Sequence, residues 1–255
     1  MKKPRYTMAD VERWEKVCQG RISLFIPRLQ SGGTDVRMRR LDYAGVAGLS
    51  FSQAQSCVAR ELYPRTLGWL AVAVEAEIYY LHCLQQEGLV PAAGQWQSLL
   101  HAHTSTDKSL MDRYSSKFDM ELVAKSESGR RTDSMYHARL IMGLTELRID
   151  DTKAILTEKR PTSEAMFRGY YKVMEMIALN DEAGFAEAIA EASVSWEKYA
   201  RRCWKGMSDA VCFLNGVGFI RLAEHVWKHP VFVDDPNIPP GLLGDVKPET
   251  VDIGL

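Results

Sequence analysis

The side chains most able to do chemistry gather in one segment near the C-terminus, EHVWKHPVFVDDPNIPPGLL, which begins at Glu224. His225 and His229 are four residues apart, so a helix would place both imidazoles on one face. Such a pair could bind zinc, and Asp234 or Asp235 could add a carboxylate oxygen as a further ligand. The segment therefore suggests a metal centre for a hydrolase as one interpretation.

A second interpretation of the same segment needs no metal. In the zinc metalloprotease motif the Glu follows the first His, whereas here Glu224 precedes His225 and would point about 100° away from it on a helix. Pro230 follows His229 directly and favours the end of the helix there. A histidine near a helix C-terminus also complements the helix dipole. In this interpretation the acids are candidates for a partner surface, and the tail is pinned to the core by the apolar residues Val226, Trp227, Val231, Phe232, Leu242 and Leu243.

Another histidine pair occurs in the stretch HAHTSTD, where His101 and His103 fall in a predicted loop. A His-x-His pair can chelate a metal in a strand, but Asp107 is the one acid nearby. The Ser and Thr residues of this stretch favour a helix N-cap before Leu110. We therefore expect loop and cap chemistry here instead of a metal site.

Two glutamates, Glu75 and Glu77, lie within the most apolar stretch, LGWLAVAVEAEIYYLHCL. They face apart on a helix, so we expect one to face solvent and the other to be a buried carboxylate with a partner, because an unpaired buried charge is costly. A di-metal helical bundle would need Glu-x-x-His on two helices, and that motif does not occur in the sequence. The acids also interrupt the ~20 apolar residues that a membrane span needs, which predicts a core helix.

Motifs for nucleophilic catalysis and phosphate binding are missing from the sequence, which contains neither Gly-x-Ser-x-Gly nor Gly-x-x-x-x-Gly-Lys. Gly216 and Gly218 lie within a helical pattern with no strand before them, which indicates close helix packing. The RMRR cluster at 37–40 could contact phosphate or an acidic partner, although a solvated face is the commoner meaning of so short a run.

The cysteines indicate reduced, buried thiols. Their number is odd, their spacings are wide and no Cys-x-x-Cys occurs, which does not fit a disulfide framework. The basic start of the chain meets Asp10, Glu12 and Glu15 where a signal peptide needs an apolar run, so no secretion signal is expected. Both features predict a cytoplasmic protein. The five cysteines are Cys18, Cys57, Cys83, Cys203 and Cys212.

Charge is unevenly distributed along the chain, although the net charge of −1 gives no overall signature of nucleic-acid or membrane binding. Residues 1–40 carry ten Lys and Arg against four Asp and Glu, whereas residues 230–255 carry five acids and one Lys. This difference allows two faces of opposite charge, or local variation on a solvated surface.

Helical spacing of apolar residues runs through almost the whole sequence, and no strand-like alternation recurs. Thr7 or Asp10 is expected to cap the first helix and Asp181 a later one, whereas residues 41–50 and 125–131 are expected to be loops. The expected helices are about 10–28, 50–87 with a break near Leu62 caused by Pro64, two short helices within 94–116, 132–147 with an extension to 157, 163–179, 182–204 and 209–228.

The short joints between these helices predict antiparallel neighbours. The fold class is therefore expected to be all-α, with a single multi-helix domain over residues 1–255 and an irregular C-terminal tail. Within it we expect an N-terminal basic subregion at 1–45, core helices at about 50–229 and the tail at 230–255.

Two blocks in the C-terminal third resemble a known family. Residues 170–202, YYKVMEMIALNDEAGFAEAIAEASVSWEKYARR, join two helices by a short acidic joint, with a late aromatic residue and basic residues in the second. Residues 209–243 join a helix of small and apolar residues, interrupted by Asn215 and Arg221, to a Val-rich piece, an acid and a Pro-Leu-Leu-like ending. Both blocks resemble the immunity protein 49 family, all-helical antidotes of bacterial polymorphic toxin systems.

The resemblance implies an immunity protein of interbacterial competition, type VI secretion included, that binds one cognate toxin domain in the cytoplasm and neutralises it stoichiometrically. It brings no catalytic residue, cofactor or metal ligand with it. Alternatives that remain open are a helical metal-dependent hydrolase using His225, His229 and Asp234, and a general helical adaptor. The residues expected to contact the partner are Glu224, His225, His229, Asp234 and Asp235.

Overall fold

The computed structural model describes residues 5–32, 35–121, 123, 133–159 and 167–255. Helices dominate this part of the chain and no strand occurs in it, so the expected all-α class is confirmed. The α-helices are α1 Met8–Gln30, α2 Val36–Ala59, α3 Tyr63–Gln86, α4 Trp96–Ser105, α5 Lys108–Lys117, α7 Asp133–Thr145, α8 Ile149–Leu156, α9 Tyr170–Leu179, α10 Glu182–Cys203 and α11 Leu214–Trp227. Single turns of 3-10 helix are η1 Ala93–Gln95, η3 Ser208–Ala210 and η4 Pro240–Leu242.

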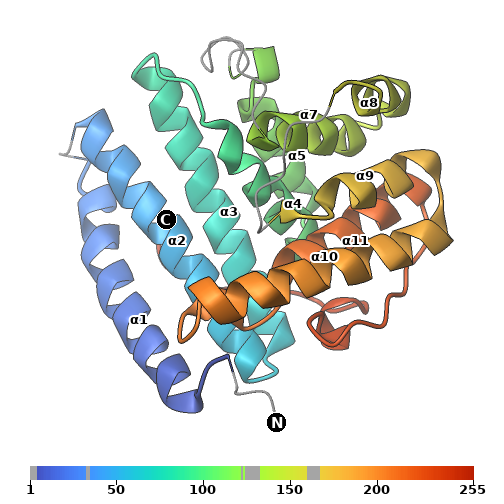
Figure 1. Cartoon of the computed structure of the whole chain (residues 1–255). Coiled ribbons are helices and arrows are strands. Elements are labelled where there is room, and N and C mark those ends of the chain that lie inside the picture. The colour runs from blue at the N-terminus through green and yellow to red at the C-terminus, as the bar shows by residue number, and fades with distance from the viewer. Residues whose placement is uncertain (1–4, 33–34, 122, 124–132, 160–166) are drawn as a thin grey trace.

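Three long helices, α1, α2 and α3, lie side by side along one side of the molecule (Figure 1). They follow one another in the chain, and α2 packs against both of the others. The helices α9, α10 and α11 make up the opposite side, with α7 and α8 above α9 in the same view. Between the two sides lies α4, which contacts α3, α5, α7 and α11 and so joins the halves of the molecule.

Several expected helix ends are confirmed. Thr7 caps α1 and forms a reciprocal capping box with Asp10. Pro64 lies in the first turn of α3, after the expected break from α2. Asp181 caps α10, where its Oδ1 accepts a hydrogen bond from the Gly184 N–H at 2.9 Å. Each helix start has a local cause. A polar side chain accepts hydrogen bonds from the free N–H groups of the first turn, or a proline stands where its missing N–H would have had no partner within the helix.

The expectation of a loop at 41–50 is wrong, because these residues lie inside α2. This helix begins after Asp35, whose side chain accepts a hydrogen bond from the Met38 N–H at 2.8 Å. Gly45 allows α1 to approach closely, since a Cβ there would lie 2.7 Å from the Phe25 ring. The helical period is weak because α2 also buries polar residues, namely Asp42, Ser50, Gln53, Gln55 and Ser56.

The helix expected from Thr132 or Asp133 is divided in two. α7 ends at Thr145, and Leu147 adopts a left-handed backbone with φ 57° before α8 begins. The expected loop at 125–131 and the expected helix start at 161–163 lie outside the described residues.

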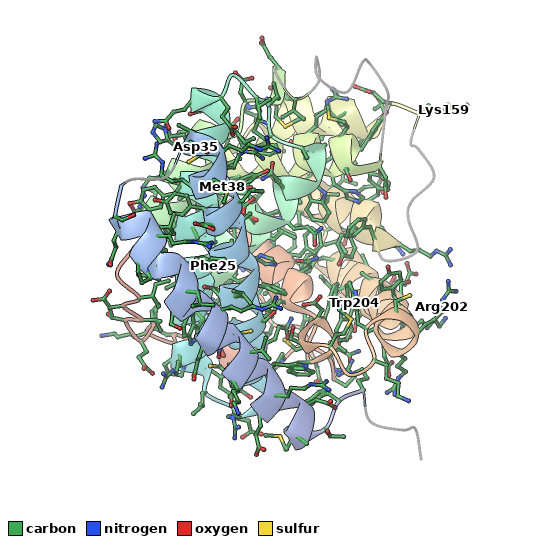
Figure 2. The ribbon with its side chains drawn as sticks, turned by 90° about the vertical axis from the view of Figure 1, so that its left-hand side faces the viewer. Phe25, Asp35, Met38, Lys159, Arg202 and Trp204 are labelled. Atoms are coloured by element: carbon green, nitrogen blue, oxygen red, sulfur yellow. The ribbon has the colours of Figure 1, made fainter. Side chains whose placement is uncertain are left out.

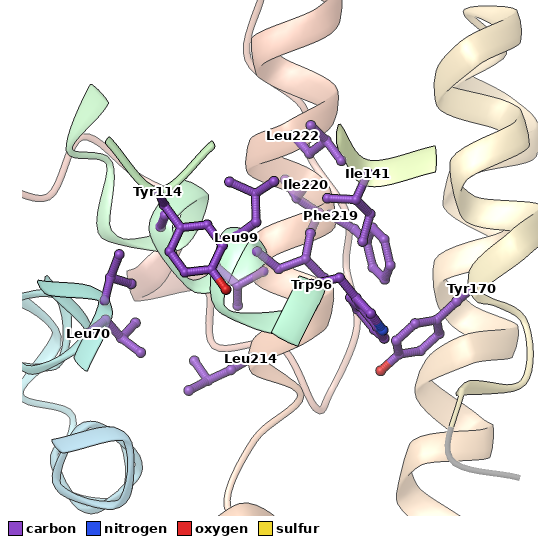
Figure 3. Packing of buried hydrophobic residues seen from close by; sticks show 14 of the residues in the cluster. Leu70, Trp96, Leu99, Tyr114, Ile141, Tyr170, Leu214, Phe219, Ile220 and Leu222 are labelled. Carbon is purple, nitrogen blue, oxygen red and sulfur yellow. The ribbon is translucent and has the colours of Figure 1, made fainter. Parts of the chain in front are cut away.

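One hydrophobic core runs through the described chain, from Ile22 on α1 to the C-terminal tail. Its centre is aromatic: Figure 3 shows Trp96 beside Tyr170, with ring centroids 6.0 Å apart, and Phe219 lies 5.0 Å from Tyr170. Because Ile22 and Ile26 of α1 belong to this core, the described part of the expected subregion 1–45 is not separate from it, and the expected boundary of the core helices near residue 50 falls inside α2.

The long apolar helix α3 is the one helix among the described residues that could cross a membrane by length and composition. In this structure 67% of its most apolar window is buried inside the protein. α3 packs against α2, α4 and α5, so its apolar surface already has protein neighbours. This arrangement is that of a core helix, as its sequence predicts.

The close approach of α11 to α4 predicts that Gly218 tolerates no side chain. A Cβ at Gly218 would lie 2.7 Å from the carbonyl oxygen of Leu100. Crowding of this kind costs about 1–3 kcal/mol, so we expect Gly218→Ala to lower the free energy of unfolding in urea by that amount. Gly20→Ala in α1 is the matched control, because a Cβ there meets nothing within 4 Å and better helix propensity should add up to ~1 kcal/mol. Equal stability of the two variants would contradict close packing at Gly218.

Candidate functional site

The histidines of the C-terminal segment do not share a helical face, contrary to expectation. α11 ends at Trp227, and the next residue has a left-handed backbone, so His229 lies outside the helix. The His225 Nε2 lies 2.9 Å from the carbonyl oxygen of Thr145. His229 instead stacks on Trp227, and its Nε2 lies 3.2 Å from a carboxylate oxygen of Glu182. The two imidazoles therefore contact different residues and do not face a common point.

The zinc interpretation of this segment finds no assembled ligand set. Within the described ranges, no group of three or more His, Cys, Asp or Glu side chains is arranged to hold a metal ion. The neighbouring acids also differ from each other. Asp235 Oδ1 accepts hydrogen bonds from the Ser193 hydroxyl at 2.7 Å and the Asn237 N–H at 2.8 Å, whereas Asp234 is exposed. Of the two acids, Asp234 is thus the one available to a partner.

We call residues 228–237, which follow α11, the exit segment. Glu224 holds this segment in place and is not available as the expected partner contact. Its Oε1 accepts a hydrogen bond from the Val231 N–H at 3.2 Å, and its Oε2 accepts one from Arg221 at 2.8 Å. Arg221 also donates to the carbonyl oxygens of Leu242 and Gly244, at 2.9 and 2.8 Å. An arginine within a helix of small and apolar residues is explained by this grip on the tail.

Alternation along the exit segment leaves one large aromatic side chain in solvent. Val231 is buried and Val233 packs against the core. Successive side chains of an extended chain face opposite ways, so Phe232 points outward and is 85% exposed. The expectation that Phe232 pins the tail is wrong, whereas Val231, Trp227 and Leu242 do pack into the core.

His101 and His103 lie in α4 and not in the expected loop. The cap before Leu110 is Asp107, which accepts hydrogen bonds from N–H groups in the first turn of α5. His103 is buried, with its Nε2 3.0 Å from the Thr145 hydroxyl. Burial, and then the nearby ring of His225, lower the pKa of His103 to about 3. His103 is therefore a neutral core histidine at ordinary pH.

His101 lines a pocket of about 510 Å³ that α2, α3 and α4 form with the chain around the end of α10 and the start of α11. Its ring stacks on Phe51 with centroids 4.6 Å apart, and burial lowers its pKa to about 4 despite a hydrogen bond with Asn215. The Asn215 amide also donates to the Tyr170 hydroxyl at 3.3 Å and to Gln97 at 3.4 Å. These side chains form an uncharged polar wall.

Two carboxyl groups line the same pocket. Glu77 accepts a hydrogen bond from Gln95 at 2.7 Å, and burial raises its pKa. Asp209 accepts one from the Ser208 hydroxyl at 3.5 Å, and burial raises its pKa too. Burial disfavours the ionised form of each carboxyl, and a single neutral donor compensates for little of that effect. Both groups are therefore poised to respond to a positive charge placed beside them.

The expectation of an inward carboxyl with a partner is met by Glu77, whereas Glu75, one of the two that could face solvent, is only partly exposed and is ion-paired. Glu77 is the carboxylate inside the molecule with an amide partner, whereas Glu75 binds Arg113 on α5 through two bonds of 2.7 Å. Sequence reasoning missed Asp209 and Trp204, which also line the pocket. Trp204, labelled in Figure 2, is the residue that directly follows α10. The one signal in the sequence was an acid within an apolar stretch, as at Glu77. The other residues that line the pocket come from distant parts of the sequence, so no local motif marks it.

The end of the acidic tail lies against the N-terminal helices. The Glu249 N–H donates to the carbonyl oxygen of Pro64 at 2.9 Å, and its carboxylate lies 3.9 Å from Arg65. The Gln30 amide donates to the carbonyl oxygen of Gly254 at 2.8 Å. The acidic tail thus runs over α1 and α3.

The basic cluster and the cysteines have structural settings. Within the RMRR cluster, Arg40 forms an ion pair with Glu87 at the end of α3, and Arg37 is exposed. All five cysteines are free, as expected, and four of them are buried. Cys203, at the end of α10, is exposed, so the expectation of a buried thiol is wrong there.

Comparisons with known proteins assign no family: no protein-family model, curated protein or solved structure matches this chain.

The unequal roles of the adjacent acids predict unequal effects of their removal. Asp235→Ala leaves the Asn237 N–H without its acceptor and removes the tie to α10, so we expect a loss of about 1–3 kcal/mol in the free energy of unfolding. Asp234→Ala, at an exposed position, should change it by less than ~0.5 kcal/mol. Urea unfolding of both variants measures the difference. A stable Asp235→Ala protein would show that these hydrogen bonds do not hold the tail.

Buried neutral histidines predict loss of stability in mild acid. The pKa values of His101 and His137 are lowered by burial to about 4 and that of His103 to about 3, against 6.5 for a free histidine. Between those values the unfolded chain binds protons that the folded protein does not. Stability should therefore fall as the pH drops from 6.5 towards 4, by about 1.4 kcal/mol per pH unit for each histidine.

Unfolding in urea at a series of pH values tests this dependence. His103→Gln should flatten the slope between pH 6 and 4.5 by about one proton. His82→Gln is the matched control, because His82 is exposed, and its slope should equal that of the unaltered protein. Identical slopes for all three proteins would rule out His103 as a source of acid sensitivity.

Proposed function

We propose that this protein is an immunity protein, which binds one cognate toxin domain in the cytoplasm and neutralises it by stoichiometric contact. The resemblance of residues 170–202 and 209–243 to immunity protein 49 suggests the class of partner. The observation that carries the proposal further is Phe232, a phenylalanine that is 85% exposed on a segment fixed by hydrogen bonds. In this proposal the protein acts without a cofactor or catalytic residue.

An exposed phenylalanine on a fixed segment is well suited to anchor a protein partner. Burying an aromatic side chain contributes strongly to association, and aromatic anchors dominate the energetics of many interfaces. Val231 on one side and Asp235 on the other tie the segment to the protein. Little conformational entropy is then lost when Phe232 is covered, so the anchor is preorganised.

The surroundings of Phe232 extend this surface. The joint between α9 and α10 lies beside the exit segment, because Trp227 Nε1 donates to the carbonyl oxygen of Ile177 at 3.0 Å and His229 lies 3.2 Å from Glu182. That joint carries Leu179, which is 53% exposed. We define the contact surface as Leu179, His229, Phe232 and Asp234. It combines two apolar groups with polar and acidic groups at their edge, the usual composition of an interface.

The acid on this surface suits one kind of toxin. An enzyme that acts on nucleic acids or nucleotides needs a basic cleft for its substrate, and an acidic group on the inhibitor is complementary to it. Asp234 is exposed for that contact, whereas Glu224 and Asp235 are held within the protein. A hydrolase using His225, His229 and Asp234 is not favoured, because the two imidazoles contact different neighbours. A general adaptor would use the same surface with another partner.

Co-expression with the toxin domain encoded beside this gene separates the immunity protein from the adaptor. We expect the two proteins to form a complex that survives size-exclusion chromatography, and we expect growth of the toxin-producing host to be restored. A neighbouring domain that is toxic and yet neither binds this protein nor is neutralised by it would contradict the proposal.

Removal of the anchor is expected to weaken the complex and leave the fold intact. Phe232→Ala should cost at least about 2 kcal/mol of binding free energy, or roughly 30-fold in Kd, as for other central aromatic anchors. Its unfolding temperature should not change, since the side chain is 85% exposed. Leu24→Ala is the matched control: Leu24 is 66% exposed on α1, on the other side of the molecule (Figure 1). Equal Kd values for both variants would remove Phe232 from the interface.

Charge reversal at the surface should act mainly on the association rate. Asp234→Lys leaves the apolar contacts in place but removes attraction to a basic cleft, so association should slow and become less sensitive to salt. Stopped-flow or surface plasmon resonance at two ionic strengths measures both effects. Unchanged association kinetics would show that Asp234 does not steer the partner.

A further inference from the structure

The pocket lined by His101, Glu77 and Asp209 has the size of a small-molecule site. Its volume of about 510 Å³ falls within the range of ordinary ligand pockets. The walls come from α2, α3 and α4 and from the segment around the end of α10 and the start of α11, which are distant in sequence. Gly48 on α2 and Gly94 within η1 also line it, and a Cβ at either would meet nothing within 4 Å. The space is therefore open and not a packing fault.

The charge of the lining determines which ligands fit. Glu77 and Asp209 are its acidic groups, and none of the described lysines or arginines lines the pocket. Among the described residues, neither carboxyl forms an ion pair, in contrast to Glu75, which binds Arg113. An anion would face two carboxyls, whereas a cation would meet two carboxyl acceptors that form no ion pair with another described residue.

The other walls add apolar and aromatic surface. Phe51, Trp196, Trp204 and Phe213 all line the pocket. Aromatic faces attract cations, and this wall already binds one: the guanidinium of Arg5 lies 4.7 Å from the centroid of the Trp196 ring. A ligand with a positive group and a flat or apolar body would use both kinds of surface.

We propose that this pocket is a binding site for a small organic cation, a protonated amine or guanidinium carried on an aromatic or apolar body. Glu77 and Asp209 accept hydrogen bonds from its charged group, and the aromatic walls pack on its body. Asn215 and Gln97 provide neutral polar contacts at the same site. Binding here is separate from toxin binding, since it involves none of the residues of the contact surface around Phe232.

A series of probes that differ in charge tests the proposal on the full chain. The probes are 2-phenylethylamine, the neutral 2-phenylethanol and the anionic 3-phenylpropionate, titrated calorimetrically at neutral pH in the absence of any toxin. We expect the amine to bind with one-to-one stoichiometry and at least about tenfold more tightly than the alcohol, the effect of one charged hydrogen bond. The anion should not bind. Equal affinities of the amine and the alcohol would overturn the proposal, as would no binding of the amine.

Substitutions then locate the bound amine. Glu77→Gln and Asp209→Asn should each weaken it at least about tenfold, while Glu75→Gln, two residues away on the same helix but bound to Arg113, should not change its affinity. Unchanged affinity in both pocket variants would place the amine elsewhere and overturn the proposal.

A steric variant keeps the test decisive if a carboxyl variant fails to fold. Gly48→Leu adds a side chain at a position that lines the pocket, without a clash at its Cβ, so we expect a folded protein that no longer binds the amine. Gly20→Leu is the control, because its Cβ also meets nothing but lies on α1, away from the pocket. Amine binding that persists in folded Gly48→Leu protein would contradict the proposal.

Discussion

The hydrogen bonds of a single buried residue, Asn237, hold together the parts of this protein that matter most for function. Its N–H donates to Asp235, its side-chain amide donates to Ser193 on α10, and its carbonyl oxygen accepts from the Phe213 N–H at 2.8 Å. Its side-chain oxygen accepts from Arg5 at 2.7 Å. Every polar group of this side chain is thus satisfied in a buried place, where an unmade bond would cost about 1–3 kcal/mol. The N-terminus, α10, the start of α11 and the exit segment are fixed relative to one another by this arrangement.

Polar side chains inside the molecule also explain how much of the fold the sequence could predict. Helix ends with a local cause were predictable, as at Thr7, Pro64 and Asp181, because a cap or a proline acts on its own neighbours. The first half of α2 was not, because its buried face includes Asp42, which accepts a hydrogen bond from Arg28 on α1. A search for periodic apolar residues does not find a stretch of helix whose buried face is partly polar.

The candidate site was predictable in composition but not in geometry. The acids and histidines after Glu224 were visible as a group, yet their partners, such as Thr145 for His225 and Ser193 for Asp235, come from other helices. Those partners decide which side chains are fixed within the protein and which, like Phe232, remain exposed. The pocket was less predictable still, because Glu77 on α3 and Asp209 beyond the end of α10 line one pocket only in the folded protein. Nothing local marks such a pair.

The contact surface and the pocket share a scaffold, but each has chemistry of its own. Phe213 lines the pocket and bonds through its N–H to Asn237, which in turn positions the segment that carries Phe232. A change at Asn237 would disturb both sites and could not tell them apart. Phe232 belongs to the proposed contact surface alone and Glu77 to the pocket alone. Substituting either one therefore tests a single proposed site. If the protein binds a partner through Phe232, as we propose, it can keep the pocket as a separate site, because one set of buried hydrogen bonds holds both regions in place.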